Sequence, residues 1–282
     1  MNVLPVLLSI SLVALAMHAA ISQHPQNQSE LCPFTRKELE SFLIRETGCQ
    51  TVHLRDVQRS GDASQLHFIF GRSTGANDSV AMVGPNGRVQ VKDLPGRRTV
   101  LDDAGVPVCW VGDRLFHVAG QPDRPIGLHT RFAVAPGGRF LSFRQAPGET
   151  KLLQTGAATN GELDLPANFY ATSLFESPEG VSVFGSVSNR VVGLIIASDK
   201  QGLRITEQID LSWAGGVLDM DPLSRTLLVE SKSDLLPKWF LYNVSDRSTK
   251  PLGFGKEFAV FLRPETASVV QQLLKVDSRK PR

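Results

Sequence analysis

The fold is decided by the segment Gly216-Val-Leu-Asp-Met-Asp-Pro-Leu-Ser-Arg-Thr-Leu-Leu-Val-Glu-Ser231, followed by Lys238-Trp-Phe-Leu-Tyr-Asn-Val244 and Asp246-Arg-Ser-Thr-Lys-Pro-Leu252. Short apolar runs alternate in it with turn residues, and Pro222 stands in the first turn. This pattern is typical of antiparallel strands joined by tight loops. The segment therefore predicts one antiparallel sheet.

The turn proline of this segment recurs along the chain. Pro136, Pro178, Pro222 and Pro264 are separated by 42, 44 and 42 residues, and each lies between two β-rich runs. A spacing of about 40 to 45 residues is the length of a four-stranded propeller blade. The sequence therefore predicts an all-β chain, a five- or six-bladed β-propeller-like array of four-stranded antiparallel sheets. An unrelated β-sandwich array is the alternative.

The remaining predicted strands fall into similar units. The first unit covers 51–58, 65–70, 79–83 and 88–94, the third 131–135, 139–143, 151–154 and 162–165, and the fourth 170–175, 181–184, 191–197 and 204–211. The second is less regular, with a hairpin predicted over 106–111 and 114–119. The sixth is only half present, with strands predicted over 257–263 and 268–276. A closed ring then needs N-terminal strands to complete its last blade.

One helix is predicted, before the first strand unit. Thr35 and Glu38 have the spacing of a capping box, and Gly48 is placed to end the helix in a left-handed cap. Its single apolar face consists of Leu39, Phe42 and Leu43. We expect this helix to dock on the β body, across a sheet edge or over one mouth of the ring. No second helix is predicted after Cys49.

The N-terminus is typical of a secretory signal peptide. An apolar run extends from Val3 to Met17, no charged residue precedes Glu30, and Ala20 and Ser22 offer the small residues that a signal peptidase needs. Because no Lys or Arg precedes the run, an uncleaved anchor is the alternative. We expect a signal peptide over 1–22, a polar segment with the capped helix over 23–50, and a propeller domain over 51–282. The expected location is secreted or periplasmic.

Export permits disulfide bonds, and the chain has three cysteines. Cys32 and Cys49 flank the predicted helix, so a bridge between them is predicted, with a Cys49–Cys109 bridge as the rival.

Two predicted turns carry a family resemblance. Ala133-Val-Ala-Pro-Gly-Gly-Arg-Phe-Leu-Ser-Phe143 and Asp219-Met-Asp-Pro-Leu-Ser-Arg-Thr-Leu-Leu-Val229 resemble the Ser-Pro-Asp-Gly-Arg turn of TolB-type β-propellers. The resemblance covers residues 131–277. It implies a propeller and, by analogy, a binding platform.

No motif predicts catalysis, a cofactor or a metal. Gly71-Arg-Ser-Thr-Gly75 has the Gly-x-Ser-x-Gly pattern of a nucleophile elbow, but a turn and a strand follow it where the elbow needs a helix. The histidines show no metal-ligand spacing, and no glycine-rich phosphate loop precedes a helix. The candidates weighed for a base or a ligand are His53, His67, His117 and His129.

Composition indicates which classes of partner the chain favours. Thirty basic and 28 acidic residues give a net charge of +2, which does not favour nucleic acid. We expect a monomer with no membrane insertion after signal cleavage. Exposed tryptophans often anchor partners or sugars, and the chain offers Trp110, Trp213 and Trp239.

Two functions therefore stand as expectations. The first is a non-enzymatic platform for an unknown protein or carbohydrate partner. The alternative is a propeller-type hydrolase or lyase with acidic or His residues on the central axis. Convergence of such residues on the axis distinguishes the two.

Overall fold

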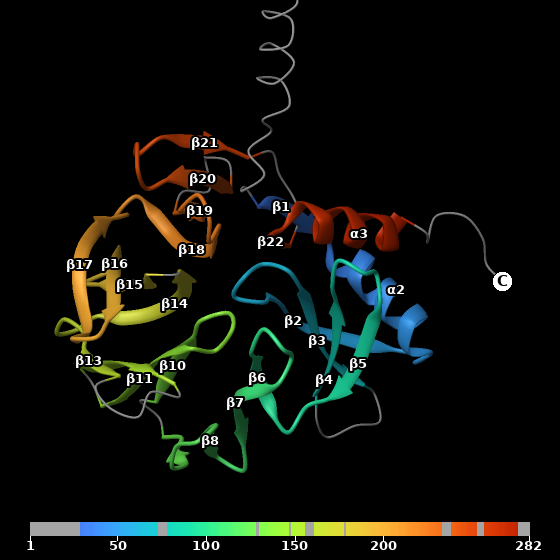
Figure 1. Cartoon of the computed structure of the whole chain (residues 1–282), viewed down its shortest axis with the longest axis horizontal. Helices are drawn as coiled ribbons and strands as arrows, with labels where there is room; N and C mark the ends of the chain where they lie inside the picture. The colour runs from blue at the N-terminus through green and yellow to red at the C-terminus, as the bar shows by residue number, and fades with distance from the viewer. Residues whose placement is uncertain are drawn as a thin grey trace, which may run out of the picture.

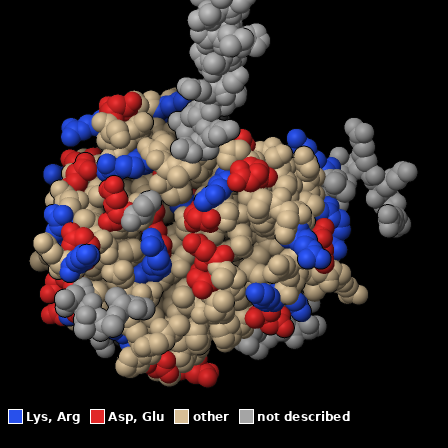
Figure 2. All heavy atoms as spheres, viewed as in Figure 1, with Lys and Arg blue, Asp and Glu red and all other residues tan. Residues whose placement is uncertain are grey.

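The computed structural model describes residues 29–72, 78–127, 130–146, 148–155, 161–177, 179–232, 238–252 and 257–275. Within these ranges, five four-stranded antiparallel sheets and one two-stranded sheet surround a common axis (Figure 1). The chain is a β-propeller. Figure 2 shows acidic and basic side chains mixed around the centre of the ring on the face turned to the viewer.

Each four-stranded sheet is a meander of consecutive strands. Sheet 1 has β2 (Val52–Arg59), β3 (Leu66–Arg72), β4 (Asp78–Val83) and β5 (Val89–Asp93). Sheet 2 has β6 (Arg97–Leu101), β7 (Pro107–Gly112), β8 (Leu115–Val118) and β9 (Arg124–Pro125). Sheet 3 has β10 (Arg131–Val134), β11 (Phe140–Ala146), β12 (Glu149–Gln154) and β13 (Glu162–Asp164). Sheet 4 has β14 (Tyr170–Ser177), β15 (Gly180–Val187), β16 (Arg190–Asp199) and β17 (Gly202–Asp210). Sheet 5 has β18 (Ala214–Met220), β19 (Thr226–Ser231), β20 (Trp239–Asn243) and β21 (Thr249–Pro251).

The two ends of the described chain close the ring. β1 (Glu30–Phe34) pairs antiparallel with β22 (Phe258–Leu262), with Cys32 opposite Val260. β22 contacts β18 on one side and β2 on the other, so it completes the row of innermost strands. The expectation that an N-terminal strand completes the last blade is confirmed, and the pairing covers a sheet edge that would otherwise be open.

Two helices lie beside this terminal sheet, in place of the outer strands of a sixth blade (Figure 1). α2 (Arg36–Thr47) has the predicted capping box at its start, and Gly48 at its end is left-handed with a φ of 68°. Its apolar face packs in one core with strands of sheet 1 and with α3 (Pro264–Lys275). α2 thus docks on the body away from the axis.

The prediction of a strand over 268–276 was wrong, because α3 occupies this segment. Pro264 fits the first turn of a helix, where its missing N–H costs nothing, and Glu265 favours the same end. Ala267 and Val270 are buried three residues apart, which is the helical spacing. Pro264 is therefore not equivalent to Pro136 and Pro222, which stand between the first and second strands of sheets 3 and 5. Pro178 lies outside the described residues.

The repeat is confirmed by the packing between blades. Leu141 and Phe143 of β11 pack in one core with Cys109 and Phe116 of sheet 2. Their counterparts Leu227 and Val229 of β19 are equally buried, in a core with side chains of sheet 4. In both sheets the alternate residues of the second strand face the preceding blade, as strand geometry requires.

The predicted Cys32–Cys49 disulfide is not formed, since Cys32, Cys49 and Cys109 are all free. Cys32 is buried in β1, whereas Cys49 follows the far end of α2. A helix of this length spans about 18 Å, while bridged Cα atoms lie within about 7 Å. The predicted signal peptide, 1–22, lies outside the described residues. In the described part, no helix is long and apolar enough to cross a membrane.

Candidate functional site

The innermost strands enclose a channel along the ring axis. Its cavity of about 310 Å³ is lined by Asp56, Gln58, Val100, Val134, Leu174, Leu218, Asp219 and Val260, among others, so that all six innermost strands contribute. We call the end where these strands begin the upstream mouth and the end where they finish the downstream mouth. Each mouth opens into a cavity of its own.

The downstream mouth is a cavity of about 320 Å³ whose charged residues are paired. Arg139 donates from its backbone N–H to Glu176 Oε1 at 2.7 Å and from Nε to Oε2 at 2.5 Å. Arg263 Nη2 donates to Asp62 Oδ2 at 3.2 Å. These pairs link the turns of different sheets, so they tie the ring together at this mouth.

A third carboxylate at the downstream mouth is held by backbone. Asp103 Oδ1 accepts the Gly61 N–H at 2.5 Å. Gly137 has a φ of +84°, and a Cβ on it would lie 3.2 Å from Asp103 Oδ1 and 3.4 Å from Glu176 Oε2. Glycine is needed here because both the backbone conformation and the close approach of two carboxylates exclude a side chain. Burial raises the pKa of Glu176, while the hydrogen bonds from Arg139 oppose that rise.

A buried ion pair joins the first and last sheets near the same end of the channel. Arg59 Nε donates to Asp219 Oδ1 at 3.1 Å, and its Nη2 donates to the Met220 carbonyl at 2.7 Å. Asp219 Oδ2 accepts the Phe261 N–H of β22 at 2.7 Å. Both charged side chains are almost fully buried. This network fastens sheet 1, sheet 5 and the terminal sheet to one another.

The upstream mouth opens into a larger cavity of about 630 Å³. It shares Asp56, Gln58, Val100 and Val134 with the channel, so the two spaces are continuous. The innermost strands of sheets 3, 4 and 5 and of the terminal sheet contact one another in turn, whereas β6 approaches its neighbours less closely. The cavity opens beside β6 for this reason.

Three arginines line the upstream cavity, namely Arg55, Arg97 and Arg98. Arg55 Nε lies 3.8 Å from Asp78 Oδ1. Neither Arg97 nor Arg98 has a hydrogen-bond or ion-pair partner within the described ranges, although the Arg98 guanidinium lies 5.9 Å from the centre of the Phe132 ring. The mouth thus presents cationic groups that the ring itself does not neutralise.

Arg98 also has an uncommon backbone conformation. Its φ is +50°, in the left-handed region that non-glycine residues rarely adopt. The β6–β7 pairing shifts register between Arg97 and Val100, which marks a β-bulge. Bulges re-aim side chains and are common beside functional sites.

One carboxylate lies deeper in the same space. Asp56 accepts the Val57 N–H at 2.9 Å and Gln58 Nε2 at 2.7 Å. The surrounding channel walls raise the pKa of Asp56, and these two hydrogen bonds oppose the rise. Its side chain nonetheless keeps contact with solvent, because the channel is open.

Two large aromatic side chains are exposed where innermost strands begin. Tyr170 is the first residue of β14 and is 43% exposed, and Trp213, just before β18, is 41% exposed. The Arg144 guanidinium lies 3.8 Å from the centre of the Tyr170 ring, which fixes the ring by a cation–π contact. Aromatic surface therefore lies on the same face as the partner-free arginines.

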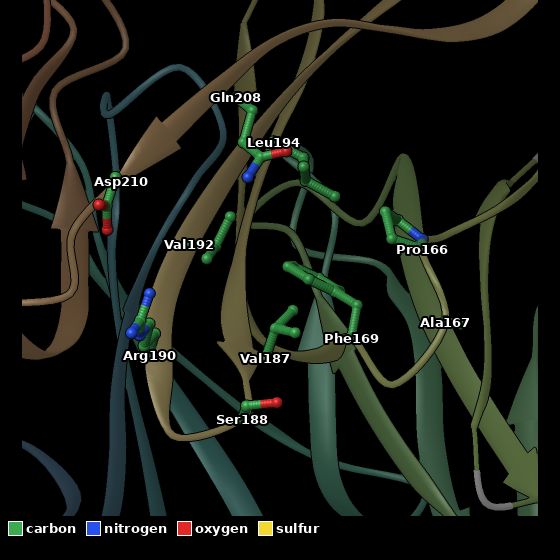
Figure 3. A pocket seen from close by; sticks show the side chains of 10 residues that line it. All are labelled: Pro166, Ala167, Phe169, Val187, Ser188, Arg190, Val192, Leu194, Gln208 and Asp210. Carbon is green, nitrogen blue, oxygen red and sulfur yellow. The ribbon is translucent and has the colours of Figure 1, made fainter.

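A groove of about 560 Å³ extends this face over sheet 4 (Figure 3). Phe169, Val187 and Val192 form an apolar floor between Arg190 on one side and Pro166 on the other. The groove lies away from the axial channel. The carboxylate of its single acidic residue, Asp210, accepts the Ser212 N–H at 2.9 Å.

The histidines weighed in the sequence do not converge on the axis. His67 is buried in sheet 1, and burial lowers its pKa to about 4. His117 pairs with Asp123 at 2.8 Å and stacks on Trp110. His53 is exposed on β2, and His129 lies outside the described residues. Within the described ranges, no three His, Cys, Asp or Glu side chains are grouped so as to hold a metal ion.

The other residues singled out in the sequence lie at different places in the fold. Gly71 and Arg72 end β3, which leads toward β4 with no described helix between them, while 73–75 lie outside the described residues. Trp239 is buried between blades, as its alternation with Leu241 predicts. Of the three tryptophans weighed, Trp213 is the one that is exposed. The arginines of the upstream mouth were not predicted, although Arg55 within β2 and Arg97 and Arg98 at the start of β6 are visible in the sequence.

Several solved structures are similar to this chain at low sequence identity. A protein of unknown function from Desulfotomaculum acetoxidans DSM 771 is similar with a TM-score of 0.42 and 11% identity, over 75% of each chain. TolB from Acinetobacter baumannii is similar with a TM-score of 0.43 and 11% identity, over 74% of this chain and 57% of that one. A prolyl endopeptidase is similar with a TM-score of 0.41 and 12% identity, over 73% of this chain and 42% of that one. No family model and no curated protein matches the sequence. The likeness is one of fold alone.

Proposed function

We propose that the protein is an exported, non-enzymatic binding platform that holds a protein partner against the upstream face of its propeller. The observation that carries the proposal is that Arg97 and Arg98 line an open cavity at the upstream mouth, while Tyr170 and Trp213 are exposed where β14 and β18 begin. Arg, Tyr and Trp are the residues that most often dominate binding energy at protein interfaces. In this protein the four residues lie at or just before the starts of innermost strands, which hold their side chains in place.

The bonding of two carboxylates at the axis, Asp219 and Glu176, favours binding over catalysis. A hydrolase or lyase of the alternative kind needs carboxylates free to exchange protons with a substrate. Asp219 is engaged by Arg59 and the Phe261 N–H, and Glu176 is engaged twice by Arg139. These groups stabilise the ring.

The partner-free arginines favour a protein over a carbohydrate. An uncharged sugar would leave Arg97 and Arg98 without a counter-charge, whereas a protein surface supplies carboxylates. The groove over sheet 4 adds apolar area on the same face. Protein interfaces combine apolar contact area with arginine and aromatic side chains, and this face offers both.

Site-specific photo-crosslinking tests the proposal in the cells that make the protein. A photoreactive phenylalanine analogue replaces Tyr170 or Trp213 on the upstream face, and Leu223, which is 52% exposed at the downstream mouth, serves as the matched control. We expect one discrete protein adduct from both upstream positions and none from Leu223. An adduct from Leu223 alone, or none from any position, would overturn the proposal.

The export component has its own test. The apolar run that ends at Met17 and the small residues Ala20 and Ser22 support cleavage after Ser22. N-terminal sequencing of protein from the medium or periplasm should begin at Gln23. A chain that starts at Met1 and stays in the membrane fraction would favour the uncleaved anchor.

A further inference from the structure

The charges of the upstream cavity do not balance. Its lining includes three arginines and two carboxylates, those of Asp56 and Asp78. Asp78 lies beside Arg55, and Asp56 accepts two hydrogen bonds from its own strand. Arg97 and Arg98 remain without a carboxylate in the described part of the chain. Arg97 and Arg98 are exposed at this open cavity, and guanidinium groups form charge-assisted hydrogen bonds with anions, so the cavity favours an anionic group.

The conformation of Arg98 points in the same direction. A left-handed backbone conformation is unfavourable for a residue with a side chain. No hydrogen bond or ion pair to Arg98 within the described ranges offsets that cost. Strained residues of this kind cluster at ligand-binding positions. The bulge places Arg97 and Arg98 on the same cavity although they are adjacent in sequence.

The space next to the arginines has an apolar part beside Asp56 and Gln58. Beyond Val100 and Val134 the cavity continues into the channel, where Leu174 and Leu218 lie. Leu218 is 42% exposed there, although burial of a large aliphatic side chain is favourable. The channel volume of about 310 Å³ suffices for one or two large apolar side chains. A ligand that fits both spaces has a carboxylate close to an apolar group.

We propose that the upstream mouth binds an acidic peptide segment of the partner, with carboxylates on Arg97 and Arg98 and a neighbouring apolar side chain inserted beside Leu218. The inference rests on the proposed function and names the chemistry of its partner. Arginine pairs with carboxylates through two parallel hydrogen bonds, which gives both strength and orientation. Nucleic acid is disfavoured because a net charge of +2 provides no extended basic surface.

Fluorescence anisotropy tests the proposal with purified full-length protein. The probe is a labelled ten-residue peptide of alternating Glu and Leu, and its matched control has Gln in place of Glu. We expect binding of the Glu peptide, weakened by salt, and at least about tenfold weaker binding of the Gln peptide. Arg97→Gln and Arg98→Gly should each weaken binding of the Glu peptide by about tenfold. Asp56→Asn should strengthen it, because the variant removes a negative charge from the same space.

Arg263→Gln at the downstream mouth is the control variant, and it should leave the affinity unchanged. Equal binding of the two peptides, or unchanged affinity in Arg97→Gln and Arg98→Gly with an intact fold, would refute the inference. So would displacement of the peptide by succinate at the peptide's own concentration, since a free dicarboxylate would then be the ligand. The crosslinking test of the proposed function does not depend on the result of the peptide experiment. Adducts at Tyr170 and Trp213 without peptide binding would mean a partner of other chemistry.

Discussion

The two mouths of one channel use their charged residues in opposite ways. At the downstream mouth, Arg139 holds Glu176, Arg263 holds Asp62, and Asp103 accepts a backbone N–H. At the upstream mouth, Arg97 and Arg98 have no such partner in the described ranges. The chain therefore uses charge at one end to fasten its blades, whereas the arginines at the other end have no carboxylate among the described residues.

The difference has a physical origin in the connections between strands. Downstream turns join the first strand of each sheet to the second, so they crowd around the axis and their side chains meet across it. Upstream, the chain arrives at each innermost strand from the outer edge of the preceding sheet. Turns that meet can neutralise one another, whereas separated strand starts leave an open cavity. Mutations at the two mouths should therefore affect different properties.

The largest effect is expected at the buried pair near the downstream end. Asp219→Ala should lower the free energy of unfolding by about 3–5 kcal/mol, because it leaves Arg59 buried without a counter-charge and removes the acceptor for Phe261. Urea denaturation measures this. Glu207→Ala, which breaks an exposed pair with Arg225, should cost less than about 1 kcal/mol. If Asp219→Ala lowered the free energy of unfolding no more than Glu207→Ala does, the pair of Arg59 and Asp219 would not hold the sheets together.

The second prediction concerns the free energy of unfolding at acid pH, to which the buried His67 contributes. Its pKa is about 4 in the fold and 6.5 in its ordinary state, so the unfolded chain binds more protons between these values. Stability should be fully present above pH 6.5 and fall by up to about 3 kcal/mol as the pH drops toward 4. Denaturation curves at pH 7.5 and 5 test this. In His67→Gln, the free energy of unfolding should depend less steeply on pH. An unchanged pH dependence would mean that carboxylates cause the loss of stability at acid pH.

A smaller effect is expected at the rim of the downstream mouth. Glu176→Gln keeps the shape of the side chain but removes the charge that Arg139 contacts, so a loss of about 1–2 kcal/mol is expected. The Arg139 side chain is half exposed, and solvent limits the effect. Arg263→Gln, whose pair with Asp62 is partly exposed on both sides, should cost less than about 1 kcal/mol in the same melts. The comparison between mouths fails if Glu176→Gln is neutral.

The smallest stability effect is expected upstream. Arg97→Gln should change the free energy of unfolding by less than about 0.5 kcal/mol, because the residue has no described partner. Arg98→Gly should be neutral or stabilising by about 0.5–1 kcal/mol, since glycine accepts a φ of +50° without strain. Thermal melts in the absence of peptide decide this. A large loss in either variant would place these arginines among the groups that hold the ring.

Much of the fold was predictable because its signals are local. The capping box of α2, the hairpin at Gly112 and the turns at Pro136 and Pro222 each depend on residues a few positions apart. α3 was missed because β-branched Val269 and Val270 suggested a strand, and the proline at the first helical position was interpreted as another turn. Ala267 and Val270 pack in the core that contains α2 and strands of sheet 1, and this packing favours a helix over a strand.

The candidate site was not predictable in the same way. Arg55, Arg97 and Phe132 belong to three different sheets and meet because β2, β6 and β10 begin at one end of the axis. That neighbourhood is a property of the closed ring, and no local pattern encodes it. Tyr170 and Trp213 lie where the innermost strands β14 and β18 begin, whereas the buried Trp239 begins β20, the third strand of its sheet, and no local pattern distinguishes these places.

The pairing of β1 with β22 has a consequence for how the protein is made. Glu30 and Leu262 are partners, so the first strand must wait for its mate until all five sheets have been synthesised. Closing so long a loop is entropically costly, and contacts of this range form late in folding. A nascent chain therefore leaves the ribosome with its ring open.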